Sequence, residues 1–539
     1  MKPLIRYSKH LDHALIILAC LCMAFLLILP WGGVSFGGLS VHRAYSPAGL
    51  VLLFAVIRII WKVLTRQFNF VLILSTFTAS LIAVSFIFWQ LYRDNSAPVV
   101  KMVRAVANPS SPTRIILITC DTLRADHLGC YGYAKDTSPN IDRLARQSVV
   151  FMNHYVQVPV TGPSHACILT GRYPWEHRVI CNATPLPPEE YTLAEVFRDN
   201  GYRTVGWIAC EILLAQQGFN QGFDEFHDDL VGEPLPPENR ADRQTDRAIE
   251  FFKNIRKDEK VFAWIHYFDP HAPYRAPGEQ NRYFLQPPDR QVDTGQERLA
   301  SIYHDNILLA TSEVEDIVAV YNGEVRFMDA EIGRFLDYLR DSGLMEDSLI
   351  VLTSDHGEEL YQHDFFIEHN QSLYEGVLRS PLIVYSPEIS RLPGIRNEIT
   401  ESVDIFPMIL SLAGIKGAQQ SRHSGVDLSA SIWRNRNIIP PRPLFAQLEL
   451  TTFFQPAYAL RKEDWKLIYH TDGRRRLYDL ASDPGERKNL ANQEKEIKRQ
   501  LKAELNSVLA ETIAAMKPSN PATFSPETLR ALKSLGYLD

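Results

Sequence analysis

Thr161 opens a segment suited to nucleophilic chemistry. Residues 161–172 read Thr-Gly-Pro-Ser-His-Ala-Cys-Ile-Leu-Thr-Gly-Arg, follow a short apolar run, and have the pattern of a loop that enters a helix. The first amides of a helix are unpaired and the helix dipole favours negative charge, so a hydroxyl there is well placed to attack an anionic ester. The alternative is a threonine that only caps the helix, with Pro163 in the first turn. The segment alone favours the cap, so the choice depends on the rest of the chain.

Acidic residues follow two of the apolar runs. Asp121 comes directly after the run 114–120, and Asp355 and His356 come at the end of the run 349–353. A lone Asp after a strand is usually a turn or capping residue. If both runs are strands of a parallel sheet, however, both acids face one crevice at its carboxyl edge. Together with Thr161 they make two carboxylates, an imidazole and a hydroxyl, which suits a divalent metal that would lower the pKa of the hydroxyl and polarise the ester oxygen.

The strands that must carry these residues are short and continuously apolar. Such runs occur at 114–120, 204–208, 261–266, 349–353 and 382–385, and they suit strands buried on both faces of a parallel sheet. Helical patterns lie between them, the clearest at 323–339, where apolar residues recur at helical spacing before Gly343. This alternation predicts a doubly wound α/β domain with a mostly parallel sheet.

The pattern changes towards the C-terminus. Short antiparallel signals run over 444–450, 458–461, 465–469 and 476–480, with Asp472-Gly473 as a hairpin turn between the last two. A Lys- and Glu-rich helix is expected over 493–516. We therefore predict a catalytic domain over 112–438, a small antiparallel α+β subdomain over 439–490, and a C-terminal helix and tail over 491–539.

The N-terminal part has the composition of a membrane anchor. The runs 14–36 and 68–92 are uncharged and about as long as a bilayer-spanning helix, and 48–61 is a weaker candidate. Lys and Arg are frequent before the first run and after the middle one, which predicts a cytoplasmic N-terminus. We expect an anchor of about three transmembrane helices over 1–95, a linker over 96–111, and a catalytic domain outside the cytoplasmic membrane, on the periplasmic side. A signal peptide is the alternative for the first run, but no small-residue cleavage site follows it.

Charge and cysteine content limit the other possibilities. The formal net charge of the 539 residues is −7, with no basic stripe that would bind nucleic acid, so we exclude nucleic acid as a partner. Five of the seven cysteines lie after the predicted spans. Five is odd, so at most two disulfides can form among them, and the spacing matches no zinc knuckle.

From about residue 112 to the C-terminus the chain resembles the sulfatase family of the alkaline phosphatase superfamily. The matching segments are 120–132, 138–145, 161–172, 354–358, 373–375, 381–384, 477–486 and 489–490. The resemblance implies an alkaline phosphatase-like fold, one or two divalent metals, a nucleophile at the start of the central helix, and transfer of a sulfuryl or phosphoryl group.

The chain departs from the sulfatase pattern at the positions that matter most. Sulfatases place a Cys or Ser, which is processed to formylglycine, in a Cys/Ser-x-Pro-x-Arg signature, where this chain has Thr161 and His165. A threonine cannot become that aldehyde, so no formylglycine is expected. Thr122 replaces the second acid of the usual pair, and His369 aligns with a sulfate-binding Lys. The Lys-x-His expected after 201–204 is missing.

At these positions the chain resembles the phosphate-handling relatives of the sulfatases, namely nucleotide pyrophosphatase-like phosphodiesterases and lipid phosphoethanolamine transferases. These relatives use an unmodified Thr with zinc or manganese. We therefore expect Asp121, Thr161, Asp355 and His356 to hold a divalent metal, with zinc or manganese favoured and calcium or magnesium as the alternative. His271 and His369 are expected to bind the anionic group or a second metal. His165 is expected as a nearby proton donor or as support behind the metal ligands.

The expected enzyme is an extracytoplasmic hydrolase or transferase that acts on an anionic phosphate-type or sulfate ester, on a lipid or glycan carrier. Three alternatives stay open: a true sulfuric ester hydrolase, a phosphoethanolamine-type transferase, and a degenerate protein that only binds.

Overall fold

The computed structural model describes residues 111–229, 240–363, 367–369, 371–415, 422–448 and 456–515. The predicted membrane spans, almost all of the linker and the C-terminal tail lie outside these residues. None of the helices within them is both long and apolar enough to cross a membrane.

An eight-stranded mixed sheet forms the centre of the catalytic part, in the order β10-β2-β9-β6-β1-β5-β3-β4. Every strand in it is parallel except β9, which runs antiparallel to both of its neighbours. The strands are β1 (Arg114–Cys120), β2 (Val149–Tyr155), β3 (Arg203–Trp207), β4 (Glu225–His227), β5 (Val261–Tyr267), β6 (Ser348–Ser354), β9 (Arg379–Tyr385) and β10 (Gly394–Glu401). The predicted mostly parallel α/β sheet is thereby confirmed.

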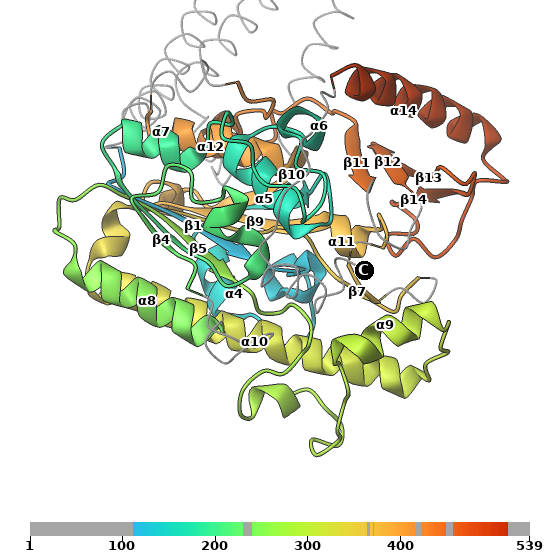
Figure 1. Cartoon of the computed structure of the whole chain (residues 1–539), viewed down its shortest axis with the longest axis horizontal. Coiled ribbons are helices and arrows are strands. Elements are labelled where there is room, and N and C mark those ends of the chain that lie inside the picture. Colours follow the sequence, from blue (N-terminus) through green and yellow to red (C-terminus); the bar gives the residue numbers. More distant parts are fainter. Residues whose placement is uncertain are drawn as a thin grey trace, which may run out of the picture. The chain divides into compact units, whose positions relative to one another are not determined.

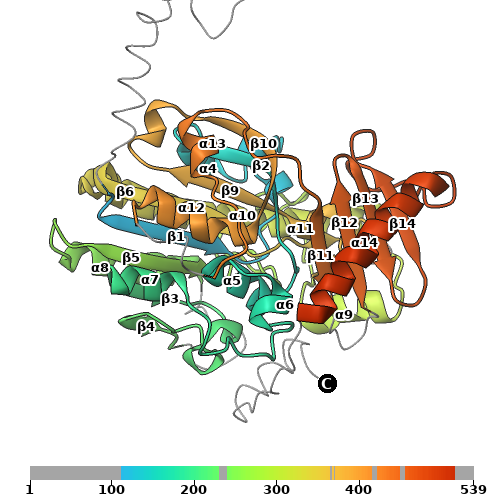
Figure 2. The ribbon, with the colours of Figure 1, turned by 90° about the horizontal axis from the view of Figure 1, so that it is seen from above.

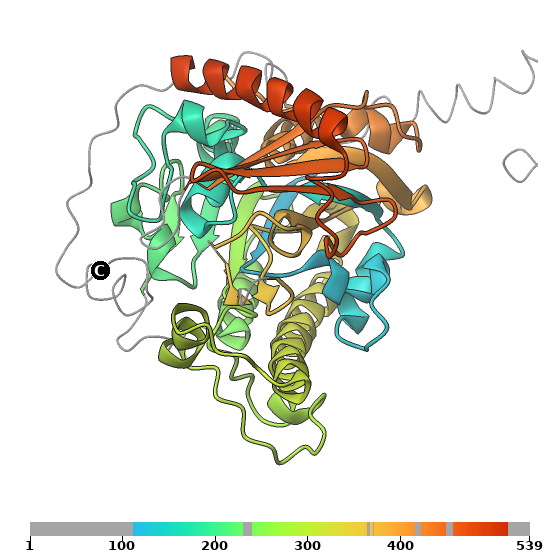
Figure 3. The ribbon, with the colours of Figure 1, turned by 90° about the vertical axis from the view of Figure 1, so that its right-hand side faces the viewer.

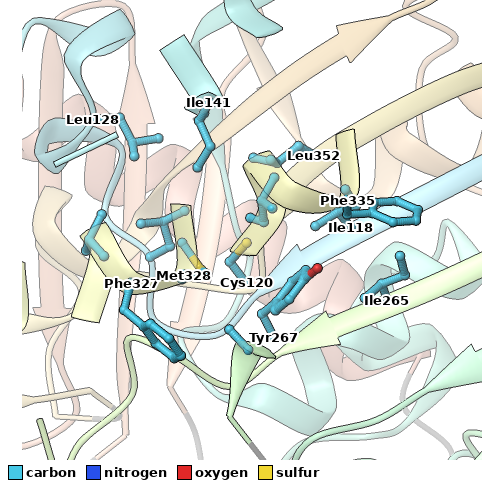
Figure 4. Packing of buried hydrophobic residues seen from close by; sticks show 14 of the residues in the cluster. Ile118, Cys120, Leu128, Ile141, Ile265, Tyr267, Phe327, Met328, Phe335 and Leu352 are labelled. Atoms are coloured by element: carbon cyan, nitrogen blue, oxygen red, sulfur yellow. The ribbon is translucent and has the colours of Figure 1, made fainter. Parts of the chain in front are cut away.

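Helices cover both faces of this sheet (Figure 1). One face packs on α4 (Pro139–Ala145), α8 (Ala241–Asn254) and α10 (Thr311–Asp341), and the other on α5 (Thr161–Thr170), α7 (Leu193–Asp199), α12 (Ile405–Leu412) and α13 (Ser429–Trp433). Alternate residues of β1 pack on opposite faces of the sheet. Ile116 and Ile118 pack in the apolar cluster on the α10 side, and Ile115 and Leu117 pack in the cluster on the α5 side. Figure 4 shows Ile118 and Cys120 among the α10-side side chains. All seven residues of β1 are buried, which explains the unbroken apolar run.

A four-stranded antiparallel sheet forms the C-terminal subdomain, in the order β11-β12-β13-β14 (Figure 2). Its strands are β11 (Leu444–Leu448), β12 (Ala457–Lys462), β13 (Trp465–His470) and β14 (Arg475–Asp479). Helix α14 (Lys495–Ala515) lies across this sheet, with Leu501 and Leu505 buried against it (Figure 3). The predicted antiparallel subdomain is confirmed, whereas the domain boundaries themselves stay predictions.

The subdomain packs on the carboxyl edge of the main sheet. Its inner face shares an apolar cluster with the residues after β2 and with α11 (Glu375–Leu378). Lys466 of β13 is buried, and its ammonium lies 2.9 Å from carboxylates of both Glu375 and Glu486. The remaining short elements are α6 (Pro174–His177), α9 (Gln296–His304), and the hairpin β7 (Glu359–Leu360) with β8 (Ile367–Glu368).

Some elements differ from the sequence prediction. Strands β2, β4 and β10 were not predicted, and α10 begins twelve residues before the expected start at Gly323. The extra turns of α10 begin with exposed, charged residues such as Glu313 and Glu315, so they lack the apolar stripe on which the prediction relied.

Candidate functional site

Asp121 lies at the centre of the carboxyl edge of the main sheet. In the parallel register, Cys120 pairs with both Tyr267 of β5 and Ser354 of β6, so Asp121 and Asp355 follow the strands at the same level. Asp121 is fully buried, and within the described chain neither of its carboxylate oxygens has a hydrogen-bond partner. Since an unpaired buried carboxylate is costly, this residue needs a cation.

Asp355 and His356 present two further unpartnered atoms. Asp355 Oδ1 accepts hydrogen bonds from the backbone N–H groups of Thr122 at 3.2 Å and His356 at 2.8 Å. His356 Nδ1 lies 3.0 Å from the Gly357 carbonyl oxygen, which places the ring hydrogen on Nδ1 and the lone pair on Nε2. Asp355 Oδ2 and His356 Nε2 lie 3.5 Å apart, buried and without a hydrogen-bond partner among the described residues. Both atoms could therefore act as ligands of a metal ion.

Thr161 is the first residue of α5, and its hydroxyl does not cap that helix. The capping position belongs to Val160, and no side chain makes a cap hydrogen bond there. The Thr161 hydroxyl is buried and has no hydrogen-bond partner within the described residues. The first turn of α5 packs on Asp355, because the Ser164 hydroxyl donates to the Asp355 carbonyl at 2.5 Å. The capping alternative therefore does not explain this hydroxyl.

His165 supports the first turn of α5. Its Nδ1 lies 2.9 Å from the Thr161 carbonyl oxygen and so donates to it, which leaves Nε2 to accept from the Thr119 hydroxyl at 3.2 Å. Thr119 accepts in turn from Trp264 Nε1 at 2.9 Å. Burial, followed by the nearby His266, holds the pKa of His165 well below its usual value. Of its two expected roles, this geometry favours support over proton donation.

His271 and His369 lie side by side next to His356. The ring centroids of His271 and His369 are 4.9 Å apart, and those of His356 and His369 are 4.5 Å apart. His369 Nδ1 lies 3.2 Å from Glu358, whose other oxygen accepts a hydrogen bond from Tyr274 at 3.1 Å. Burial lowers the pKa of His369 to about 3. Burial, followed by the neighbouring His369, lowers the pKa of His271 to about 3 as well. His369 therefore borders His356 and His271 borders His369, while the role expected for the two histidines stays a prediction.

The charges of the cluster call for a divalent cation. Burial, followed by the Glu358 carboxylate, raises the pKa of Asp121 well above the usual range, and burial, followed by the Asp121 carboxylate, does the same to the pKa of Asp355. Burial lowers the pKa of His356, so the imidazole is neutral and able to coordinate. One ligand atom from each of Asp121, Asp355 and His356 lies within 4.8 Å of the other two. The nearby Arg124 does not neutralise them, because it pairs with Asp126 at 2.8 Å.

Three residues at the site were not predicted. Cys210 and His266 form a second group with Asp121, again with ligand atoms within 4.8 Å of one another. Glu358 orients His369 through the contact described above. Cys210 and His266 lie at or just beyond the ends of β3 and β5, so their positions resemble that of Asp121. Only the adjacency of these strands in the folded sheet connects them.

Comparisons with protein families match most of the chain. The sulfatase family model matches residues 113–415. A model of the C-terminal part of N-sulphoglucosamine sulphohydrolase matches residues 362–511 and so covers the antiparallel subdomain.

Individual relatives are identical to this chain at about a quarter of the aligned positions. N-acetylglucosamine-6-O-sulfatase of Bacteroides thetaiotaomicron is 26% identical, over 76% of this chain and 87% of its own length. Human arylsulfatase A is 27% identical, over 70% of this chain and 83% of its own length. The multifunctional alkaline phosphatase superfamily protein PehA of Trinickia caryophylli is 25% identical, over 70% and 91% respectively.

Solved structures share the fold. The phosphonate monoester hydrolase of Agrobacterium radiobacter superposes with a TM-score of 0.62 at 21% identity, covering 74% of this chain and 96% of that chain. A structure in complex with its substrate D-glucosamine-2-N,6-O-disulfate superposes with a TM-score of 0.60 at 22% identity, covering 76% and 99%.

Proposed function

The chain belongs to the sulfatase family of ester hydrolases, and from this premise we propose that it cleaves a phosphate-type ester through Thr161 with the help of a divalent metal. One observation carries the proposal. The Thr161 hydroxyl is buried at the start of α5 and takes no part in capping. By the resemblance described above, Thr161 corresponds to the formylglycine precursor of sulfatases.

The chemistry of the nucleophile favours phosphorus over sulfur. A formylglycine hydrate releases sulfate by collapsing to the aldehyde, which breaks the C–O bond and spares water an attack at sulfur. A sulfated threonine has no second hydroxyl on its carbon and therefore lacks this exit. A phosphothreonine can instead be opened by water, or by an acceptor hydroxyl, that attacks phosphorus.

The residues have distinct tasks in this reaction. Thr161 Oγ1 attacks phosphorus and gives up its proton to solvent, while the bond from phosphorus to the leaving oxygen breaks and that oxygen takes up a proton from solvent. The N-terminal amides of α5 favour the negative charge of the ester and of the transition state. We propose that His271 and His369 bind the remaining phosphoryl oxygens. In the second step water attacks phosphorus, the bond to Thr161 Oγ1 breaks, and the threonine oxygen takes up the proton that the water loses.

The metal is proposed to bind Asp121, Thr161, Asp355 and His356, where it supplies a Lewis acid that lowers the pKa of the hydroxyl. The donor set fits, because the unpartnered oxygens and the imidazole nitrogen described above are the atoms that a cation would satisfy. An imidazole among oxygen ligands favours zinc or manganese over calcium or magnesium.

Turnover of matched aryl esters tests the proposal. The purified protein should hydrolyse p-nitrophenyl phosphate, bis-p-nitrophenyl phosphate or p-nitrophenyl phenylphosphonate faster than p-nitrophenyl sulfate. Thr161→Ala should abolish this turnover and Thr161→Ser should retain part of it. Thr170→Ser is the matched control, because Thr170 lies in the same helix, where its hydroxyl donates to the Ala166 carbonyl and accepts from the Arg172 N–H.

Sulfate ester hydrolysis is the second candidate, because several relatives are named as sulfatases, including the N-acetylglucosamine-6-O-sulfatase. Efficient cleavage of the aryl sulfate with inert phosphate esters would favour this candidate and overturn the first. In either case the relatives' names support an anionic group on a glycan as the substrate. A lipid carrier, or a transferase with a hydroxyl acceptor in place of water, is the remaining alternative.

We further propose that residues 1–95 anchor the enzyme in the cytoplasmic membrane with the catalytic domain on the outer side. The support is the apolar runs and the distribution of Lys and Arg described above. We would fuse a reporter enzyme that is active only outside the cytoplasm after Asp539. The fusion should show reporter activity. Cytoplasmic labelling of that fusion would refute both the number of spans and the compartment.

A further inference from the structure

We propose that Asp121, Cys210 and His266 bind a second divalent metal ion, zinc, which shares Asp121 with the ion at Asp355 and His356. One ligand atom from each of the three residues lies within 4.8 Å of the other two. The inference concerns metal binding alone and does not depend on which ester is cleaved.

Three adjacent strands of the main sheet deliver these ligands. Strand β1 lies next to β5, and β5 next to β3, all parallel. Asp121 follows β1, His266 is the penultimate residue of β5, and Cys210 follows β3. Asp355 and His356 come from β6, on the opposite side of β1. Asp121 is therefore flanked by two ligand groups, one on each side.

Burial leaves the atoms of this second group without partners. Asp121 and His266 are fully buried, and Cys210 is 2% exposed. Among the described residues neither oxygen of Asp121 nor Nε2 of His266 has a hydrogen-bond partner. One ion at the Asp355–His356 side satisfies one carboxylate oxygen most directly. The other oxygen still needs a partner, and His266 Nε2 lies 3.7 Å from Asp121 Oδ2, which is too far for a hydrogen bond.

The tautomer of His266 in the metal-free protein suggests an explanation of the unpartnered atoms that needs no second metal ion. The Ala209 N–H lies 3.3 Å from His266 Nδ1, so in the metal-free protein the ring hydrogen belongs on Nε2 and faces Asp121. Coordination requires the lone pair at Nε2 and the hydrogen on Nδ1, so the long contact with Ala209 must be given up. The alternative is that His266 moves slightly and donates to Asp121 with no second ion. These two states differ in metal content and can be separated.

The ligand types select the ion. A thiolate, an imidazole and a carboxylate match zinc, whereas calcium and magnesium prefer oxygen ligands alone. Burial, and then Asp121, raises the pKa of Cys210 well above the usual range, so without metal the group is a thiol. Binding therefore replaces the thiol hydrogen by the metal and releases one proton to solvent.

Cobalt substitution gives a readout that turnover does not affect. A cobalt ion bound to a thiolate absorbs in the near ultraviolet through sulfur-to-metal charge transfer. We would remove metal from the full-length protein with a chelator, add Co²⁺, record this band, and count bound metal by mass spectrometry. The wild-type protein should show the band and bind a second equivalent of metal. Cys210→Ser should lose the band and that equivalent.

Control variants separate the site from general thiol binding and from misfolding. Cys130→Ser removes a half-buried thiol elsewhere and should keep both the band and the metal content. Cys210→Asp replaces the thiolate by a carboxylate, so it should lose the band but keep the second equivalent. Uptake of Mn²⁺ at the Asp355–His356 side should persist in both Cys210 variants and shows that they are folded. A single equivalent in the wild type, or an unchanged band in Cys210→Ser, would overturn the inference.

Discussion

Asp355→Asn should separate metal binding from the stability of the metal-free protein. Asparagine keeps the shape of the side chain and an oxygen that accepts from the N–H groups of Thr122 and His356. It removes the negative charge and places an amide NH2 at the position of the unpartnered Oδ2. The substitution therefore tests the charge of Asp355 with little change in packing.

The metal-free variant should be more stable than the wild type. Burial and Asp121 raise the pKa of Asp355 in the folded protein, so its contribution to stability is present at low pH and is lost as pH rises through the folded pKa. At pH 7 removal of the charge is therefore favourable by about 1.4 kcal/mol for each unit of pKa shift. The entropy of unfolding is about 2.1 cal/mol/K per residue, and the unit Asn108–Asp539 has roughly 430 residues. Each 1.4 kcal/mol of stabilisation therefore raises Tm by about 1.5 °C.

Metal should stabilise the wild type much more than the variant. Manganese at about 100 times its Kd stabilises the wild type by about 2.7 kcal/mol, or about 3 °C on the same scale. Loss of an outer-shell partner already costs up to about 100-fold in metal affinity, so loss of a direct ligand should cost at least that. The variant at the same manganese concentration then gains only about 0.4 kcal/mol, or less than about 0.5 °C.

Differential scanning calorimetry of chelator-treated and manganese-loaded proteins measures both effects. Manganese is the appropriate ion because it favours oxygen and nitrogen ligands over the Cys210 thiolate. Asp337→Asn is the matched control, because Asp337 makes a surface ion pair with Arg143 and should leave both values unchanged. A metal-free Asp355→Asn protein that is less stable than the wild type, with the full manganese shift, would refute the ligand assignment.

Three further predictions concern stability around the site. Gly357→Ala should cost about 1–3 kcal/mol of unfolding free energy and most of the activity, because the added Cβ would overlap the Gly376 carbonyl oxygen beside His356; urea unfolding measures the loss. Thr122→Asn should raise Tm through about 1 kcal/mol of relieved strain, because Thr122 has a φ of 52°, which asparagine tolerates better than a β-branched residue; unchanged or lower Tm would contradict this. Burial, and secondly the charge of Arg172, lowers the pKa of His177 to about 3. The contribution of His177 to stability is therefore complete above about pH 6.5 and is smaller by about 2 kcal/mol at pH 5. Urea unfolding at both pH values should show a smaller loss of stability at pH 5 for His177→Gln than for the wild type.

The central strands were predictable because they are buried on both faces. Strands β1, β5 and β6 are continuous apolar runs, and the acids after β1 and β6 therefore marked the carboxyl edge of the sheet. Strand β10 lies at the edge of the sheet and alternates buried and exposed residues, with Ile395 59% exposed, so it lacks that signal. Strand β2 contains Asn153 and His154, which interrupt its apolar run.

The site was predictable only where its residues adjoin recognisable local patterns. Thr161, Asp121 and the Asp355–His356 pair each stand at the end of an element that the sequence marks. Cys210 and His266 carry no local mark, because their relation to Asp121 depends on the order of β1, β5 and β3 in the sheet. The same holds for Glu358, whose contact with His369 depends on how the chain folds back between them.

The covalent intermediate on Thr161 is the most direct test of the account. The protein is mixed with excess bis-p-nitrophenyl phosphate or p-nitrophenyl phosphate, quenched in acid during turnover, digested, and analysed by mass spectrometry. The account predicts a phosphoryl group from the monoester, or a p-nitrophenylphosphoryl group from the diester, on the peptide that contains Thr161, and no modified peptide in Thr161→Ala. Turnover of the phosphate esters by Thr161→Ala at the wild-type rate, or a phosphoryl group on another residue, would contradict it.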